Sequence, residues 1–393
     1  MLLCPIKKHS ELHPNAIAIR TDTQHVTYAE LDRVIESYSI TQNITTWCPT
    51  GTLDDIVKLW AIFRAKKIAF LLNPRLPEEQ RQNHITQATK IIPGATTYLL
   101  TSGTTRAPKI AVHSFENYRI NASSTLHNMP LIPGDAWLLN LPLFHVGGLG
   151  ILFRCFLSAA TVVLGNSFEG VTHVSMVPTQ LYRLLNEGTD FSELHVVLLG
   201  GGPAPMSLLK RAYDLGVPLY TTYGLTEMSS QVTTTSSDRT WEDTQTAGYL
   251  LCDRELKIAE DGEILVKGPT LFLGYINSEN EIGDWFHTRD RGFIDKLGRL
   301  HVLGRLDRMF ISGGENIQPE EIECALLESE VTQAFVVPES DVEFGFRPVA
   351  YVDGIPNLEK LKSLLPKFKI PVRFSPWNER PASVTWKNEA KSL

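Results

Sequence analysis

The chain has 393 residues, more than the roughly 250–300 at which a single hydrophobic core stops growing, so at least two folding units are expected. With 43% hydrophobic and 21% charged residues, and with 27 Gly and 23 Pro spread along it, the chain has the composition of a globular protein, which argues against extensive disorder. Its formal net charge of -7 argues against sequence-independent binding to nucleic acid, because such binding needs many cations to neutralise phosphates.

Targeting signals and cysteine pairing are also unsupported by the sequence. The apolar part of residues 1–10 is too short for a signal peptide, and no apolar run approaches the ~18–20 residues that span a bilayer, so we expect a cytoplasmic protein. The five cysteines are odd in number, far apart and without a CxxC pair, which argues against a disulfide framework or a zinc–thiolate site. These features do not determine the oligomeric state, and both a monomer and a homo-oligomer are compatible with them.

The first segment with chemical character is TSGTTRAPK, residues 101–109, which follows an apolar run. It combines four hydroxyl side chains with Gly103 and Lys109, and hydroxyls, open backbone N–H groups and a cation are what an ATP triphosphate requires. The GxxxxGK[ST] pattern is absent here, so a P-loop NTPase or kinase loses its main support. A solvated polar turn is the alternative for this segment taken alone.

Two residues stand out in the following segment, LPLFHVGGLGILFRCFLSAA. His145 lies between an apolar run and a glycine cluster, where an imidazole and bare backbone would face one ligand, although a satisfied core histidine is the plainer alternative. Arg154 is the only charge in a helix-like apolar stretch. A lone buried charge is costly, so Arg154 requires a partner, which is either an internal carboxylate or a second carboxylate of the substrate.

The middle of the chain repeats an order of short apolar run, turn and helical pattern, which predicts an α/β fold around a parallel sheet. Strands are expected at residues 171–176 and 195–199, and Pro178 is placed where a first helical turn tolerates it. Gly200, Gly201 and Gly202 let the backbone turn sharply after the second strand. A third strand, VPLYTTYG, follows.

The segment TTYGLTE continues that third strand and offers four groups suited to a nucleotide. Tyr223 is suited to stacking, Gly224 to close backbone approach, Thr226 to a phosphate hydrogen bond, and Glu227 to Mg²⁺ as a hard oxygen ligand.

After about Gly248 the pattern changes to short strands and turns, including a pair of strands around Leu297 and Gly298. Asp290 is suited to accept two ribose hydroxyl groups, and Arg305 presents a fixed fork of donors. A helix is expected from Pro319, with glutamates in its first turns.

These blocks, in this order and across nearly the whole chain, resemble the acyl-adenylate-forming superfamily of acyl-CoA synthetases, adenylation domains and luciferases. The resemblance implies a large N-terminal acid- and ATP-binding domain, residues 1–306, of packed α/β layers, and a small mobile α+β C-terminal domain, residues 307–393. It implies that ATP is bound by Thr101, Ser102, Gly103, Thr104, Thr105, Lys109, Gly200, Gly201, Gly202, Tyr223, Gly224, Thr226, Asp290 and Arg305. It also implies Mg²⁺ at Glu227, a hinge at Asp307 and coenzyme A as co-substrate.

The family's catalytic lysine comes from the C-terminal domain, and Lys387 resembles it in spacing, with Lys391 as the alternative. Trp386 stands where the family has glycine before that lysine, and Arg106 stands where it has glycine in the phosphate segment. Thr226, Glu227 and His145 are expected to act with Lys387. The pair Gly313 and Gly314 beside the hinge either forms a second working face for thiol transfer or is a rigid turn.

LPLFHVGGLGILFR, LLGGGPAP, HTRDRG and GGENIQPEEIE, among other blocks, resemble more specifically the o-succinylbenzoate-CoA ligase family of menaquinone biosynthesis. That resemblance implies an aromatic dicarboxylate substrate, with Arg154 available to one carboxylate. Another aryl- or fatty-acid CoA ligase and a stand-alone adenylation enzyme remain alternatives within the superfamily. A nucleotide-binding regulator that lost the chemistry is the alternative from a different class.

Overall fold

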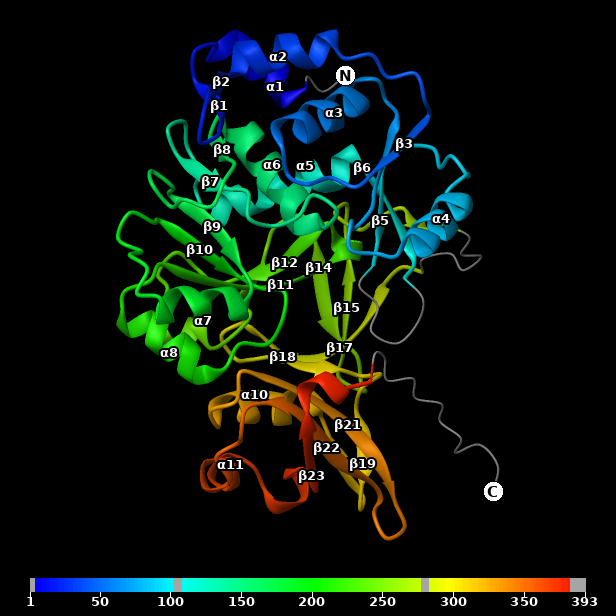
Figure 1. Cartoon of the computed structure of the whole chain (residues 1–393), viewed down its shortest axis with the longest axis vertical. Helices are drawn as coiled ribbons and strands as arrows, with labels where there is room; N and C mark the ends of the chain where they lie inside the picture. Colours follow the sequence, from blue (N-terminus) through cyan, green and yellow to red (C-terminus); the bar gives the residue numbers. More distant parts are fainter. Residues whose placement is uncertain (1–3, 102–107, 277–282, 382–393) are drawn as a thin grey trace.

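The structure is a computed structural model that describes residues 4–101, 108–276 and 283–381. Helices and strands are mixed along the described chain (Figure 1), which confirms the predicted α/β fold class. No helix in these ranges combines the length and apolar character needed to cross a membrane. Five expected site residues lie outside these ranges: Ser102, Gly103, Thr104, Thr105 and Lys387. Arg106, Trp386 and Lys391 lie outside them as well.

The largest sheet has nine strands, and its central part is parallel. Across the sheet the order is β13 (Tyr249–Leu250), β12 (Ser230–Thr234), β11 (Leu219–Leu225), β10 (Val196–Leu199), β9 (His173–Met176), β7 (Ala136–Leu138), β8 (Thr161–Val163), β1 (Ile17–Arg20) and β2 (His25–Thr27). β9 and β10 are buried along their whole length, as expected for parallel strands covered on both faces. The strands predicted at residues 171–176 and 195–199 are confirmed within two residues.

Alternate residues of these strands belong to two different hydrophobic clusters, one on each face of the sheet. On β10, Val196 and Leu198 join the cluster that contains Trp60 and Phe153, whereas Val197 and Leu199 join the cluster of α7 and α8. The helices of the first face are α1 (Pro5–Leu12), α2 (Tyr28–Ser37), α3 (Leu53–Arg64), α5 (Phe115–Asn128) and α6 (Val146–Ser158). Those of the second face are α7 (Pro178–Asn186) and α8 (Met206–Asp214), with the short α9 (Trp241–Thr244) beside them. α7 begins at Pro178, as predicted.

A second sheet has five strands and lies beside α4 (Glu78–Gln87) (Figure 1). Its order is β16 (Gly274–Tyr275), β6 (Ile110–Ser114), β5 (Ala95–Leu100), β4 (Ile68–Leu71) and β3 (Ile44–Trp47). β5 and β6 are antiparallel neighbours, so Thr101 and Lys109 meet at the ends of paired strands. β16 adds to the other edge of β6 and places Tyr275 opposite Ala111.

A third sheet of four antiparallel strands leads into the C-terminal segment. Its order is β14 (Glu255–Ile258), β15 (Glu263–Lys267), β17 (Phe286–Ile294) and β18 (Leu300–Arg305). The predicted strand pair around Leu297 and Gly298 is confirmed as β17 and β18, and Gly298 has a φ of 84°. A positive φ of this size favours glycine at that turn.

The segment after β18 has its own hydrophobic cluster, drawn from residues 310–374. Its strands are β19 (Phe310–Ser312), β20 (Glu315–Ile317), β21 (Gln333–Asp341), β22 (Gly345–Asp353) and β23 (Arg373–Pro376), and its helices are α10 (Pro319–Glu328) and α11 (Leu358–Leu364). Short 3₁₀ turns occur at η1 (Thr226–Met228), η2 (Lys367–Lys369) and η3 (Trp377–Glu379). Figure 1 shows this segment, orange to red, at the far end of the molecule from α1, α2 and α3.

Candidate active site

Thr101 and Lys109 close the base of the segment that the sequence assigns to phosphates. The Thr101 backbone N–H donates to the Lys109 carbonyl oxygen at 2.9 Å, and the Lys109 N–H donates to the Thr101 hydroxyl oxygen at 3.2 Å. These bonds continue the pairing of β5 and β6 by one step, so the two ends of the segment are held together. The Lys109 ammonium lies 4.7 Å from the centroid of the Tyr275 ring, a distance at which the ring attracts the cation.

Tyr275 also contacts the acidic residue assigned to the metal. Its hydroxyl donates a short hydrogen bond to Glu227 Oε1. Burial, together with the neighbouring Glu227 carboxylate, raises the pKa of Tyr275, so the hydroxyl stays protonated and remains a donor. Lys109, Tyr275 and Glu227 therefore form one contiguous group, although they come from three separate parts of the chain.

Thr226 and Glu227 form a single 3₁₀ turn, η1, directly after β11, and a buried histidine anchors that turn. The His113 ring Nε2 is 2.7 Å from the Thr226 carbonyl oxygen, and full burial lowers the pKa of His113 to about 4, so the ring is neutral near pH 7. In that form Nε2–H donates to the carbonyl. The Glu227 carbonyl oxygen in turn accepts from the Phe272 N–H at 2.7 Å.

A second group lies where β11 meets β17 and β18. The Tyr223 hydroxyl donates to Asp290 Oδ2 at 2.6 Å, and Arg305 Nη1 donates to Asp290 Oδ1 at 3.3 Å. Arg305 also donates twice to Asp307, at 3.1 and 3.0 Å. Burial raises the pKa of Asp290 above its ordinary value. Tyr223, Asp290, Arg305 and the expected hinge residue Asp307 are thus in one hydrogen-bonded chain.

Glycines beside this group allow neighbouring segments of backbone to approach each other closely. At Gly224 an added Cβ would lie 2.1 Å from the Ser230 carbonyl oxygen, so no other residue fits between β11 and β12 without moving the backbone. Gly201 has a φ of 82°, and a Cβ at Gly200 would lie 2.7 Å from the Thr222 methyl group. Around Gly202 no atom lies within 4 Å of an added Cβ, so the turn after β10 is open at that position.

His145 and Arg154 are both placed by α6. His145 is the residue before the first turn of that helix and its side chain is exposed, with its ring centroid 4.7 Å from that of Phe144. Partial desolvation by the surrounding protein lowers the pKa of His145. The core-histidine interpretation is therefore wrong for this residue.

Arg154 is almost wholly buried, at 1% exposure, and its partners are not the expected ones. Arg154 Nη1 donates to Gln231 Oε1 at 2.9 Å, and the guanidinium carbon lies 4.4 Å from the centroid of the Trp137 ring. In the described part of the chain no carboxylate forms an ion pair with it, so the internal-carboxylate alternative is not borne out there. Burial lowers the pKa of Arg154 to about 10, which leaves it charged near pH 7.

Gly313 and Gly314 form the turn between β19 and β20, with φ values of 56° and 87°. The Gly313 N–H donates to the Phe344 carbonyl oxygen at 2.9 Å. A Cβ at Gly313 would lie 2.7 Å from the Phe344 ring, so this glycine is needed for packing. The pair therefore forms a structural turn in this arrangement of the chain.

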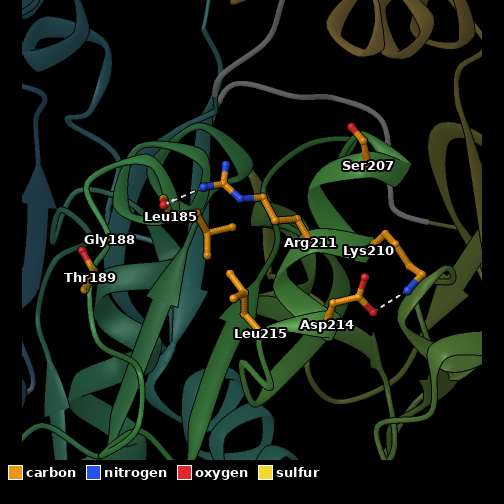
Figure 2. A pocket seen from close by; sticks show the side chains of 8 residues that line it. All are labelled: Leu185, Gly188, Thr189, Ser207, Lys210, Arg211, Asp214 and Leu215. Atoms are coloured by element: carbon orange, nitrogen blue, oxygen red, sulfur yellow. Dashed lines mark hydrogen bonds and ion pairs between the residues drawn. The ribbon is translucent and has the colours of Figure 1, made fainter.

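Figure 2 shows a pocket elsewhere, between α7 and α8, lined by Leu185, Arg211 and Lys210 among others. Its two cations are already paired: Arg211 Nη2 donates to the Leu185 carbonyl oxygen at 2.7 Å, and Lys210 pairs with Asp214. None of the expected site residues lines it, so we do not treat it as the reaction centre.

Sequence reasoning missed several members of the site. Tyr275, His113, Trp137 and Gln231 hold predicted residues in place, yet none belongs to a motif with a recognisable spacing. A weak signal existed for Tyr275, since an aromatic residue after glycine begins a short strand-like stretch. Their roles follow from contacts between segments far apart in the chain.

Comparison with known proteins gives a consistent result. The profile of the family described as AMP-binding enzyme matches residues 78–276. The chain is 42% identical over 294 residues to a 2-succinylbenzoate–CoA ligase of Salmonella typhimurium, a match that spans 70% of this chain and 63% of that enzyme. It is 32% identical over 420 residues to the 2-succinylbenzoate–CoA ligase of Bacillus cereus, with 97% of this chain and 86% of that enzyme covered.

Solved structures agree over the whole length. The o-succinylbenzoate CoA synthetase of Bacillus subtilis, in complex with its acyl-adenylate intermediate, superimposes with a TM-score of 0.88 at 30% identity, covering 99% of this chain and 98% of that one. The same enzyme in complex with ATP and a magnesium ion superimposes with a TM-score of 0.87 at 29% identity.

Proposed function

Because this chain belongs to the AMP-binding enzyme family and is similar to 2-succinylbenzoate–CoA ligases, we propose that it activates 2-succinylbenzoate with ATP and transfers the acyl group to coenzyme A. The observation that carries this proposal is that Lys109, Tyr275 and Glu227 form one group and Tyr223, Asp290 and Arg305 another. The two groups are neighbours, because β11 carries Tyr223 and leads directly into the turn of Glu227, and because the Arg305 charge acts on Tyr275. A cation, a hard oxygen ligand, an aromatic ring and a carboxylate together match the parts of a magnesium nucleotide.

In the first step a substrate carboxylate oxygen attacks the α-phosphorus of ATP, an O–P bond forms, and pyrophosphate leaves. Two anions approach each other, so fixed positive groups must face the developing charge. Lys109 is held at the base of the phosphate segment by its bonds to Thr101 and supplies one such charge. We assign Ser102, Gly103, Thr104 and Thr105, the residues that follow Thr101, to the same phosphates.

Mg²⁺ fits the residues present, because the Tyr275 hydroxyl holds Glu227 Oε1, while the second oxygen accepts no hydrogen bond from the described residues and offers a hard ligand next to Thr226. When bound, the ion neutralises phosphate charge. Tyr275 orients the Glu227 carboxylate and His113 holds the Thr226 backbone, so this chain fixes the ligand set before nucleotide arrives.

For the nucleoside, Tyr223 and the open turn of Gly200, Gly201 and Gly202 are assigned to adenine, and Gly224 to the close approach of backbone. Asp290 is assigned to the ribose, and each of its oxygens accepts one hydrogen bond from the described residues and keeps a further acceptor site. Arg305 links this carboxylate to Asp307, so the ribose contact and the proposed hinge share one side chain.

For the acid, Arg154 is assigned to the carboxylate that does not react. Its charge is buried, and a neutral amide and an aromatic ring are its partners, so an anionic partner would compensate a charge that the described residues leave without a carboxylate. His145 opens the helix that carries Arg154, so we assign it to the same acyl pocket.

In the second step the thiol sulfur of coenzyme A attacks the acyl carbonyl, a C–S bond forms, and AMP leaves. We propose that residues 307–393 turn about Asp307 between the two steps, and that Lys387 bridges the acyl and phosphate oxygens in the first. A separate hydrophobic cluster in residues 310–374 supports such a unit. Aryl- and fatty-acid ligases, a stand-alone adenylation enzyme and an inactive regulator are the alternatives that the test must separate.

The test is ATP–pyrophosphate exchange with 2-succinylbenzoate, benzoate and a fatty acid, followed by assay of the thioester with coenzyme A. We expect exchange and thioester only with 2-succinylbenzoate. Exchange without thioester would indicate a stand-alone adenylation enzyme, and no exchange with any acid would indicate a regulator.

Two variants sharpen the test. Lys387→Ala should lower adenylate formation by about 10²–10³, as expected for one well-placed charged donor, whereas Lys391→Ala should leave it nearly unchanged. Arg154→Lys should lower kcat/KM for the acid about 10- to 100-fold at unchanged KM for ATP, because a bidentate fork is replaced by a point charge. Arg33→Lys, at an exposed position of α2, is the matched control. Equal kinetics for Arg154→Lys and Arg33→Lys would contradict the assignment.

A further inference from the structure

Three potential metal ligands meet where β7, β9 and β10 begin. These strands are neighbours in the nine-stranded sheet (Figure 1). Asp135 immediately precedes β7, His173 is the first residue of β9, and His195 immediately precedes β10. Since these three strands are neighbours and parallel, their first residues are brought to one place. One ligand atom from each side chain lies within 4.8 Å of the others.

The three side chains differ in burial in a way that suits a bound ion. Asp135 and His173 are buried, whereas the His195 side chain is 64% exposed and gives access from solvent. His195 Nδ1 already lies 3.5 Å from Asp135 Oδ1.

Neighbouring groups already orient the buried ligands. The Ile132 N–H donates to Asp135 Oδ2 at 2.9 Å, which leaves Oδ1 facing His195. His173 Nε2 is 3.3 Å from the Pro130 carbonyl oxygen, and Nδ1 is 2.7 Å from the Thr172 hydroxyl oxygen. The Thr172 hydroxyl has a second acceptor, the Ala136 carbonyl oxygen at 3.2 Å, so a metal on Nδ1 would not leave that hydroxyl without a partner. Such second contacts are usual around metal-binding histidines.

We propose that Asp135, His173 and His195 form a binding site for a divalent transition metal of the Zn²⁺ or Co²⁺ type, with water completing the coordination. Two imidazole nitrogens and one carboxylate oxygen match the ligands that these ions prefer, whereas Mg²⁺ prefers oxygen ligands alone. The inference does not depend on the proposed reaction.

This site is separate from the turn of Gly200, Gly201 and Gly202 that we assign to the nucleotide. His195 precedes β10 and Gly200 follows it, so at about 3.3 Å per residue the strand places them roughly 16 Å apart, on opposite edges of the sheet. The ion would join the starts of three strands, which is the arrangement of a structural site. We therefore expect it to raise the stability of the fold.

The experiment is a titration of the full chain with Co²⁺, without ATP and with Mg²⁺ in excess, followed by visible absorption and calorimetry. We expect one Co²⁺ per chain, displaced by Zn²⁺, and a higher melting temperature of the loaded protein. His195→Ala and Asp135→Asn should each weaken binding by at least about tenfold. His25→Ala, an exposed histidine of β2, and Glu227→Gln should bind as the parent does.

Equal Co²⁺ affinity in the parent and in His195→Ala would overturn the proposal, as would the absence of binding at millimolar Co²⁺. His195 is exposed, so its variant should fold even where Asp135→Asn does not, and it decides the question by itself. Loss of Co²⁺ binding in Glu227→Gln would place the ion at the nucleotide site instead. Adenylation activity enters none of these readouts.

Discussion

Tyr275 joins the two groups that we propose for the phosphates and Mg²⁺. Its ring faces the Lys109 ammonium at 4.7 Å, and its hydroxyl donates to Glu227. Because β16 pairs with β6, the backbone fixes Tyr275 next to the end of the phosphate segment. A single side chain thus sets the distance between the cation and the carboxylate before any ligand binds, and such preorganisation lowers the cost of binding.

Tyr275→Phe should therefore keep the contact with Lys109 and lose the one with Glu227. We expect the Mg²⁺ concentration for half-maximal pyrophosphate exchange to rise by about tenfold, the usual effect of removing a group that orients a metal ligand. Tyr182→Phe, on the exposed face of α7, serves as the control. An unchanged Mg²⁺ dependence would show that Glu227 is oriented by other groups.

At the scale of elements, α10 and α8 meet through one hydrogen bond. The Ser207 N–H, in the first turn of α8, donates to Glu328 Oε1 at 2.6 Å, and Glu328 is the last residue of α10. A carboxylate at the start of a helix interacts favourably with the helix dipole. In this arrangement α10 of the C-terminal segment therefore caps α8, which packs on the nine-stranded sheet. The proposed rotation about Asp307 would have to break that hydrogen bond.

Glu328→Gln should weaken this cap without changing the size of the side chain. We expect hydrogen exchange at the Ser207 amide to accelerate about two- to fivefold, because a charged cap contributes about 0.3–1 kcal/mol. Exchange measured by mass spectrometry on peptides that cover residues 203–210 gives the readout. Glu359→Gln, whose ion pair with Lys362 lies within α11, should leave those peptides unchanged. If both variants exchange alike, the bond does not hold the segment.

At the scale of the molecule, the sheets are joined by buried polar contacts as well as by hydrophobic clusters. His113 belongs to the five-stranded sheet, and its ring holds the turn that follows β11 of the nine-stranded sheet. Asn117, at the start of α5, donates to the Pro269 and Leu271 carbonyl oxygens, which lie between the third sheet and β16. These bonds fix how the sheets sit around the site.

The neutral state of His113 predicts a pH dependence of stability. Burial lowers its pKa to about 4 in the folded protein, whereas the unfolded chain titrates near its usual value, about 6.5. Between these values the unfolded chain binds more protons, so the free energy of unfolding falls as the pH falls from about 6.5 to 4, by up to about 1.4 kcal/mol per pH unit for one histidine. Above about pH 6.5 His113 is neutral in both the folded and the unfolded chain, so the free energy of unfolding no longer changes with pH through this residue.

His113→Gln keeps a hydrogen-bond donor and removes the titration. Urea unfolding between pH 7 and 4.5 should show a shallower loss of stability in this variant than in the parent, by at most the slope of one proton. His127→Gln, at an exposed position of α5, is the control and should keep the parent's slope. Parallel pH profiles for the parent and His113→Gln would mean that His113 titrates normally in the folded state.

The sequence by itself determined much of the local structure of this protein and which side chains are available for its chemistry. The strands before Pro178 and Gly200, the helices from Pro178 and Pro319 and the turn at Gly298 follow from short-range rules of backbone geometry. The family also followed from the sequence, because its motifs are contiguous blocks. The partners of the site residues did not, since Glu227 meets a tyrosine 48 residues away and Thr226 meets a histidine 113 residues away.

Only the tertiary structure decided which side chain faces which. The sequence predicted that a buried Arg154 needs a partner. That its partners are the Gln231 amide and the Trp137 indole, and not a carboxylate, depended on how α6 packs against β7 and β12. Asp135, His173 and His195 carry no motif, and they meet because three parallel strands begin at one edge. The physical reason is that register between distant strands is fixed by the packing of whole sheets, to which a single sequence offers no local signal.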